Sequence, residues 1–179
     1  FGQVADGQMT LVETLADVAA LQPEDPEALA FLTQTTLSVD DTRAIIEALQ
    51  TRFPNIVGPK GEDICYATSN RQDAVKKIAT DCQLVLVIGA PNSSNSLRLV
   101  EVAERGGAAA KLIQRADEID LAWFDGVDRV GLTAGASAPE ILVREVTNLL
   151  DAHFEIRTEK VKTAEENMVF KLPRGLEAA

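Results

Sequence analysis

The sequence predicts a globular α/β protein that is built on a largely parallel sheet and does not insert into a membrane, and three observations support this. Short β-branched runs alternate with longer amphipathic stretches along the 179 residues, as strands alternate with helices in such proteins. The composition is globular, with 46% hydrophobic and 25% charged residues. The longest apolar run, residues 84–90, is too short to span a bilayer. We expect two small units of mostly parallel sheet flanked by helices, residues 1–61 and 62–150, and then a C-terminal tail, residues 151–179.

The first unit contains two short apolar runs, residues 9–13 and 28–33, that predict strands. Ser38, with Asp41 three residues later, forms an acidic variant of the capping box and predicts the start of a helix. Apolar residues then recur at helical spacing until Pro54, which stops the helix.

The turn-rich stretch Gly58–Gly61 separates the two units. Beyond it, apolar runs bounded by polar junctions again predict strands and helices in alternation. In chain order these are a helix at 69–81, a strand at 83–88, a helix at 95–105 and a strand at 109–113. A strand at 127–132 follows. The last helix opens with a capping box at Ser137–Glu140 and runs to Leu150.

Charge and cysteine content exclude several classes of function. Seventeen basic and 28 acidic residues give a net charge of −11, which opposes nonspecific binding to nucleic acid or anionic lipid. Two cysteines without a CxxC motif and one histidine cannot form a complete zinc or iron-sulfur site.

No signal peptide opens the chain, so we expect a cytoplasmic protein, or one of the plastid stroma. Because Phe1 is not Met, we expect that the N-terminal part of the protein is missing.

Three junctions between predicted strands and helices are rich in hydroxyl and amide groups. In a parallel sheet such junctions meet at one edge, where helix N-termini attract anions. The residues also fit simple helix caps, but a cap does not need consecutive donors, and three such junctions favour an anion site. None is a Walker A loop or a Rossmann fingerprint, so nucleotide binding is not indicated. The junctions are Thr33–Ser38, Ala90–Ser96 and Thr133–Ser137.

Cys65 precedes a predicted helix and lies near Arg71, a setting that favours the thiolate. The alternative is a buried, inert cysteine. Cys82 precedes the strand at 83–88 and is interpreted as structural, because it lies away from the carboxyl ends of the strands. His153 follows the last helix, where a surface or capping role is expected.

Several of these stretches match, in order, the signatures of a known family. Together they resemble the 4-hydroxy-3-methylbut-2-enyl diphosphate reductases, LytB-type iron-sulfur enzymes, over essentially the whole chain. The matching stretches are Thr33–Thr42, Ile56–Pro59, Asp63–Thr68, Asn70–Gln72, Asn92–Ser96 and Thr133–Pro139.

The resemblance implies three α/β units around a central 4Fe–4S cluster held by three cysteines, of which this chain would be the second and third units. The tail would then pack on the missing N-terminal unit. Cys65 matches the third cluster ligand, and the other two are expected in the missing part. Thr35 matches a catalytic threonine near the substrate hydroxyl, with Thr36 as its neighbour. The residues that match the positions binding the substrate diphosphate, or lie beside them, are Ser93, Ser94, Asn95 and Ser137.

The activity implied by the resemblance is the reductive dehydroxylation of 4-hydroxy-3-methylbut-2-enyl diphosphate. The products are isopentenyl and dimethylallyl diphosphate, at the last step of the non-mevalonate isoprenoid pathway. Ferredoxin or flavodoxin would supply the electrons, since the chain has no flavin or nicotinamide motif of its own. This chain alone is expected to be incomplete and inactive. The competing hypothesis is a non-catalytic phosphate-binding or interaction module derived from the same fold.

Overall fold

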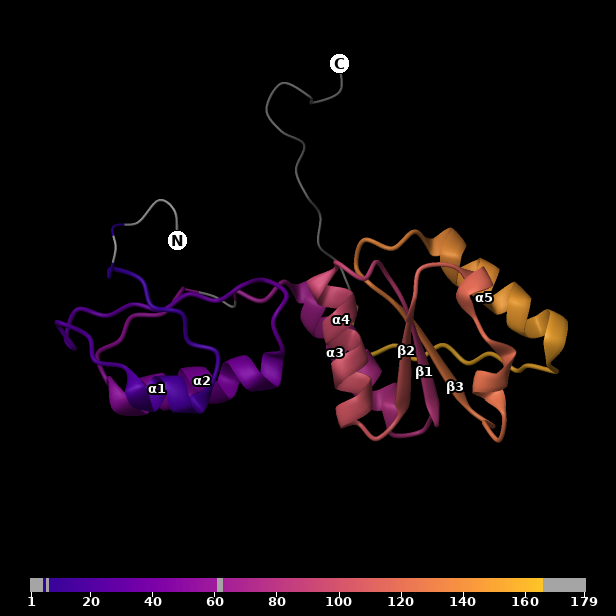
Figure 1. Cartoon of the computed structure of the whole chain (residues 1–179), viewed down its shortest axis with the longest axis horizontal. Helices are drawn as coiled ribbons and strands as arrows, with labels where there is room; N and C mark the ends of the chain where they lie inside the picture. Colours follow the sequence, from indigo (N-terminus) through magenta and orange to yellow (C-terminus); the bar gives the residue numbers. More distant parts are fainter. Residues whose placement is uncertain (1–4, 6, 61–62, 166–179) are drawn as a thin grey trace, which may run out of the picture.

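The computed structural model describes residues 5, 7–60 and 63–165. It is a mixed α/β fold, as expected, around one three-stranded parallel sheet with the order β2-β1-β3 (Figure 1). The strands are β1 (Leu84–Ile88), β2 (Ala109–Ile113) and β3 (Val130–Ala134). Two helices, α3 and α4, cover one face of the sheet, and α5 covers the other.

The central strand β1 is fully buried along its length, because helices cover both faces and strands pair with both edges. Val85 and Val87 pack against α3 (Tyr66–Ala79) and α4 (Ser94–Arg105). Leu84, Leu86 and Ile88 pack on the opposite side against α5 (Glu140–His153). An unbroken apolar run is the sequence pattern of such a strand.

The connection from β2 to β3 contains two short 3-10 helices, η1 (Ala116–Glu118) and η2 (Leu121–Phe124). Phe124 at the end of η2 is buried in the cluster beneath α5. Helix α3 lies so close to β3 that a Cβ added to Gly131 would sit 2.3 Å from Cγ2 of Ile78. A glycine at this position therefore permits close packing of the helix on the sheet.

The first region, residues 7–60, contains α1 (Leu15–Ala20) and α2 (Val39–Arg52). The strands expected at 9–13 and 28–33 do not form, apart from a single parallel bridge between Ala30 and Val57. The reason is the lack of neighbouring strands: Leu11, for example, is 58% exposed. A strand is stabilised by its pairing partners rather than by its own sequence.

Several boundaries in the second region, residues 63–150, differ from expectation. Helix α3 begins at Tyr66 instead of residue 69, and β3 covers Val130–Ala134 instead of 127–132. The register with β1, which pairs Leu84 with Val130, sets the position of β3. Helix α5 begins at Glu140, and its N-cap, Pro139, has no side-chain capping bond. The capping box expected at Ser137 was therefore wrong, because Ser137 belongs to the turn that follows β3.

The first turn of α2 connects the two regions through charged side chains. Asp40 pairs with Lys76 of α3 at 2.8 Å. Asp41 pairs with Arg105 of α4 at 2.8 Å and lies 4.0 Å from Arg98. Burial opposes ionisation of Asp41, but the Arg105 guanidinium and the Ser38 hydroxyl together hold the pKa of its carboxyl below the ordinary value.

The start of the tail packs on the second region. The Phe154 ring lies 5.3 Å from that of Phe124, and Ile156 packs against the same cluster. Ile156 is therefore partly buried there, whereas Phe154 remains 39% exposed. Val169, Phe170 and Leu172 lie outside the described residues, so packing of the tail on another unit stays a prediction. Among the described helices, none has the length and apolar character needed to cross a membrane.

Candidate anion-binding site

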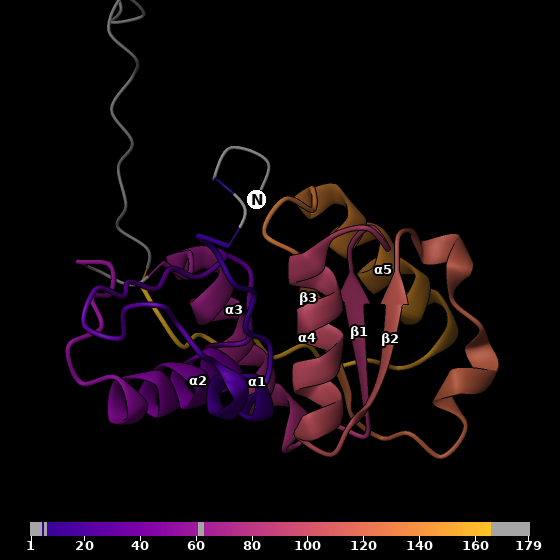
Figure 2. The ribbon, with the colours of Figure 1, turned by 60° about the vertical axis from the view of Figure 1, so that its left-hand side comes forward.

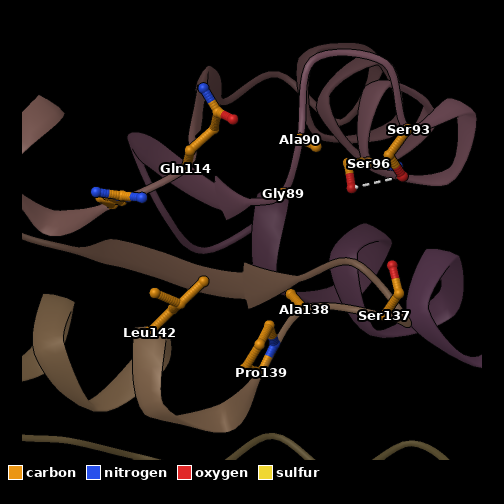
Figure 3. Close-up of a pocket in the computed structure, with 10 residues that line it drawn as sticks. Gly89, Ala90, Ser93, Ser96, Gln114, Ser137, Ala138, Pro139 and Leu142 are labelled. Atoms are coloured by element: carbon orange, nitrogen blue, oxygen red, sulfur yellow. Dashed lines mark hydrogen bonds between the residues drawn. The ribbon is translucent and has the colours of Figure 1, made fainter.

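A pocket of about 250 Å³ opens where the three strands end (Figure 3). Its walls come from the segments that follow β1, β2 and β3, which is the crevice expected for a parallel sheet. It is lined by Gly89, Ala90, Ser93, Ser96, Gln114, Arg115, Ser137, Ala138, Pro139 and Leu142.

Ser93 is the N-cap of α4 and also lines the pocket. Its Oγ accepts hydrogen bonds from the Ser96 backbone N at 3.3 Å and from Ser96 Oγ at 3.0 Å (Figure 3). The capping interpretation is confirmed for this residue. Both bonds use the oxygen as acceptor, however, so the hydroxyl proton remains able to donate to an anion.

Ser96 is almost fully buried, and its hydroxyl lies close to the main chain of Gly89 and Gly135. A Cβ added to Gly89 would lie 2.1 Å from Ser96 Oγ, and one added to Gly135 would lie 2.4 Å from it. Glycine at both positions is therefore required for this hydroxyl to occupy its place between the ends of β1 and β3.

Asn95 is buried, at 7% exposure, and neither its Oδ1 nor its Nδ2 has a hydrogen-bond partner among the residues that the structure describes. Its Nδ2 faces the turn after β3, 3.7 Å from where a Cβ on Gly135 would lie. Burying an unpaired amide group costs about 1–3 kcal/mol. A buried amide in this state calls for a partner from outside the described residues.

Ser137 lies in the turn after β3 and its side chain lines the same pocket (Figure 3). It does not cap α5, whose N-cap is Pro139, so the capping interpretation was wrong for this residue. Ser94, the first residue of α4, is exposed and is not among the residues lining the pocket.

Thr35 and Cys65 form a second group at the same edge of the molecule. The Cys65 backbone N donates to the Thr35 carbonyl O at 3.0 Å, and Thr36 lies in the same turn as Thr35. Cys65 is exposed and stands at the N-cap of α3 without a side-chain capping bond. In Figure 2, α3 and α4 both start at the edge where the strands end, but within residues 7–60 and 63–165 no hydrogen bond joins this group to the pocket.

The residues present do not form a complete metal site. No group of three or more histidine, cysteine, aspartate or glutamate side chains is placed to hold a metal ion within the described part of the chain. Cys65 can therefore supply one thiolate to an iron-sulfur cluster but cannot hold the cluster on its own.

The other two candidates occupy structural positions. Cys82 is half-buried at the amino end of β1, and burial together with the nearby Asp81 raises the pKa of its thiol. A protonated thiol packed among apolar side chains fits the structural role expected for it. His153 lies in the last turn of α5, with Nδ1 2.9 Å from the Leu149 carbonyl O, which fits the expected surface or capping role.

The sequence analysis did not predict the place of three residues at the pocket. Ser96 lay within a junction that was recognised, but its contact with two glycines depends on residues that are distant in the chain. Gln114 and Arg115 follow β2 at the pocket wall, and the only signal for them was their place directly after a predicted strand. Arg115 is exposed, and it is the one cationic side chain among the described residues that line the pocket.

Comparison with known proteins places this geometry in a family. The family model described as LytB protein matches residues 1–151. The chain belongs to the LytB family. Among curated relatives, a 4-hydroxy-3-methylbut-2-enyl diphosphate reductase of Hyphomonas neptunium is 60% identical over 98% of this chain. The enzyme of the same name from Roseobacter denitrificans is 57% identical over 98% of it.

A solved LytB-family structure shares the fold as well. The E-1-hydroxy-2-methyl-but-2-enyl-4-diphosphate reductase of Plasmodium falciparum superposes with a TM-score of 0.84 and 36% sequence identity over 91% of this chain. The aligned part is 52% of that protein. The chain likewise spans 56% of the Hyphomonas and Roseobacter relatives, so it corresponds to about half of the proteins it resembles.

Proposed function

We propose that this chain provides the diphosphate-binding part of a 4-hydroxy-3-methylbut-2-enyl diphosphate reductase, which forms isopentenyl and dimethylallyl diphosphate. The observation that carries the proposal is the buried amide of Asn95, which has no hydrogen-bond partner among the described residues. Asn95 is not itself among the residues that line the pocket, but it stands between Ser93 and Ser96, which line it together with Ser137. A diphosphate oxygen is the kind of acceptor that this amide lacks. The relatives' shared name, a diphosphate reductase, supports the same assignment.

The net charge of −11 means that the chain as a whole repels an anion. Binding must therefore come from short, directed hydrogen bonds. The hydroxyls of Ser93 and Ser137 and Nδ2 of Asn95 act as donors, and the N-terminus of the 12-residue helix α4 adds its dipole. Each charge-assisted bond contributes about 1.5–3 kcal/mol.

Thr35 and Thr36 have a different role in this proposal. Their turn is bonded to Cys65. In this proposal the diphosphate of the substrate occupies the pocket, and its hydroxyl end lies at Thr35, which assists proton delivery. Cys65 contributes one thiolate to a 4Fe–4S cluster whose other ligands lie outside this chain. Because the described residues do not complete that site, the remaining steps of the reduction belong to groups beyond them. A ferredoxin or flavodoxin is the proposed electron donor.

Titration of this chain with inorganic pyrophosphate tests the anion site. Asn95→Leu removes the buried amide, so it should increase the free energy of unfolding by about 1–3 kcal/mol while weakening pyrophosphate binding at least about tenfold. Ser137→Ala should weaken binding about tenfold and leave stability unchanged, because Ser137 caps no helix. Calorimetry and thermal unfolding measure both quantities. Unchanged affinity in both variants would remove the proposal's basis.

The described residues do not form a complete metal site. A second candidate function is therefore that of a non-catalytic phosphate-binding module. A chimaera separates the two. It joins this chain to the part of the Hyphomonas neptunium relative that the chain does not cover, and is reconstituted anaerobically with iron and sulfide. Turnover of the diphosphate substrate supports the reductase. Pyrophosphate binding without turnover, in a chimaera whose cluster spectrum is normal, supports the module.

A further inference from the structure

Gln72 connects the two regions through a side chain that is fully buried, at 0% exposure. It projects from α3 and uses both ends of its amide. Its Oε1 accepts from the Val39 backbone N at 3.0 Å, and its Nε2 donates to the Leu37 carbonyl O at 2.8 Å. Both partners belong to the segment that leads from the Thr35–Thr36 turn into α2.

The same segment is fixed at two further points. The backbone N and Oγ1 of Thr33 donate to Oδ2 of Asp63, at 2.8 and 3.3 Å. The Cys65 backbone N donates to the Thr35 carbonyl O. Residues 33–39 are therefore bonded before, within and after the turn to α3 or to the residues that lead into it.

These bonds make the turn and Cys65 parts of one assembly. Gln72 lies about two helical turns after Cys65 on α3, so a rigid helix carries both residues. The Asp63 and Cys65 bonds hold the turn from its N-terminal side, and only Gln72 among these three ties holds it from the α2 side. The exposed pairs of Asp40 with Lys76 and of Asp41 with Arg105 also tie the first turn of α2, but they attach beyond Val39. Without Gln72, the backbone at residues 37–39 loses its own bonds to α3, and the turn can move relative to Cys65.

We propose that Gln72 is a positioning residue that fixes the Thr35–Thr36 turn relative to Cys65. Its relevance to catalysis rests on the function proposed above. Glutamine suits this position because one amide both donates and accepts. A glutamate could accept from Val39 but could not donate to Leu37, and a methionine of similar shape could do neither.

A simpler role competes with this one. Val39 is the first residue of α2, and its N–H has no partner within the helix. Gln72 could then act only as a cap for α2, with no effect on the turn. The two roles differ in which backbone amides lose protection when Gln72 is replaced.

Amide hydrogen exchange on this chain separates the two roles. In Gln72→Met, positioning predicts that the Cys65 and Thr33 amides exchange at least about tenfold faster, together with Val39. Amides of β1 should be unchanged, which shows that the protein remains folded. If Val39 alone is accelerated, Gln72 is only a cap and the proposal is wrong.

Two further variants provide controls. Gln83 is a second glutamine whose side chain accepts from a backbone amide, that of Arg129 at 2.9 Å, at the opposite end of the sheet. Gln83→Met should leave the Cys65 and Thr33 amides unchanged, and acceleration there would count against positioning. Gln72→Glu keeps one of the two bonds and should give intermediate exchange rates. Rates equal to those of the unaltered chain would contradict the claim that both bonds of Gln72 are needed to position the turn.

Kinetics in the chimaera connect the geometry to turnover. Gln72→Met should lower kcat at least about tenfold and change KM for the diphosphate substrate by less than about twofold, because the anion pocket is untouched. A rise in KM with unchanged kcat would contradict positioning of the turn. If the chimaera has no activity even with Gln72, the proposed function fails, and the exchange rates alone decide whether Gln72 positions the turn.

Discussion

The two regions of the molecule are stabilised in different ways. Residues 63–150 have a fully buried central strand with an apolar cluster on each side. Residues 7–60 have one small cluster, in which Val18, Leu49 and Phe53 are the buried members. The same region exposes several large apolar side chains, including Leu32 at 76% and Val57 at 63%. Only the second region has a core large enough to define its own structure.

This difference also separates the two candidate groups of functional residues. The anion pocket is built on strand ends, where Gly89 and Gly135 leave room for the buried Ser96 side chain. The Thr35–Thr36 turn lies in the weakly packed region and depends on bonds to Asp63, Cys65 and Gln72. Anion binding should therefore tolerate disturbance of the first region, whereas any chemistry at the turn should not.

The largest expected effect comes from separating the regions. A chain of residues 63–165 should unfold cooperatively, because it contains both apolar clusters around β1. Residues 1–60 alone should show no cooperative transition, since so small a core cannot offset the loss of chain entropy. Circular dichroism during heating measures both. A cooperative transition in the 1–60 piece would remove the contrast between the regions.

Two matched leucine substitutions compare the cores directly. Leu86 is completely buried and Leu49 is 7% exposed. Leu86→Ala should lower the free energy of unfolding by about 4 kcal/mol, near the upper end for such a change. Leu49→Ala should lower it by about 2 kcal/mol, because its more loosely packed neighbours can move into the space that the side chain leaves. Denaturant unfolding of the whole chain gives both values. Equal costs would mean that the two cores are equally well packed.

The two cysteines should differ in thiol reactivity. Cys65 is exposed, whereas Cys82 is half-buried and burial raises the pKa of its thiol. At pH 8 a disulfide reagent should label Cys65 at least about tenfold faster than Cys82. The two single alanine variants identify which site reacts.

The raised pKa of Cys82 also has a consequence for stability. The folded state holds this proton more tightly than the unfolded chain does. The resulting stabilisation is present below the unfolded thiol pKa and is lost as the pH rises through the folded pKa. Cys82→Ala should therefore show a smaller alkaline loss of stability than the unaltered chain, and an identical loss would contradict this account.

The smallest effect is expected at the charged contacts between the regions. Asp41→Asn removes the pairs with Arg105 and Arg98 and should lower stability by about 0.5–1 kcal/mol near pH 7. Because the pKa of Asp41 is lowered, this difference should vanish as the pH falls through the folded pKa. Glu140→Gln, which alters a pair within α5, is the control and should have no comparable effect.

The sequence predicted best those strands that find pairing partners in the folded sheet. The strand at 109–113 was predicted with its observed bounds, and β1 differs from its prediction by one end residue. The run at 9–13 has similar residue types but forms no strand, because nothing pairs with it. The predicted start of α5 was wrong, because a residue with a side-chain hydroxyl, such as Ser137, can serve either as a helix cap or as part of a pocket wall.

The candidate site was predictable in part. The three polar junctions indicated an anion crevice at the carboxyl ends of the strands, and two of them, around Ser93 and Ser137, do line one pocket. The place of Ser96 between two glycines and the unpaired state of Asn95 depend on contacts between separate strands. No local pattern encodes such contacts. The roles of Thr35 and Cys65 came only from family resemblance and stay predictions.

The position of Trp123 has a practical consequence for following the fold. It is the only tryptophan in the chain; it lies in η2 and packs against the cluster beneath α5, with the Lys111 ammonium 5.4 Å from its ring centre. Its fluorescence therefore reports on the unfolding of the sheet region and not on that of α1 and α2. Comparing tryptophan emission with circular dichroism, which records every helix, allows the melting of the two regions to be observed separately in a single unmodified sample.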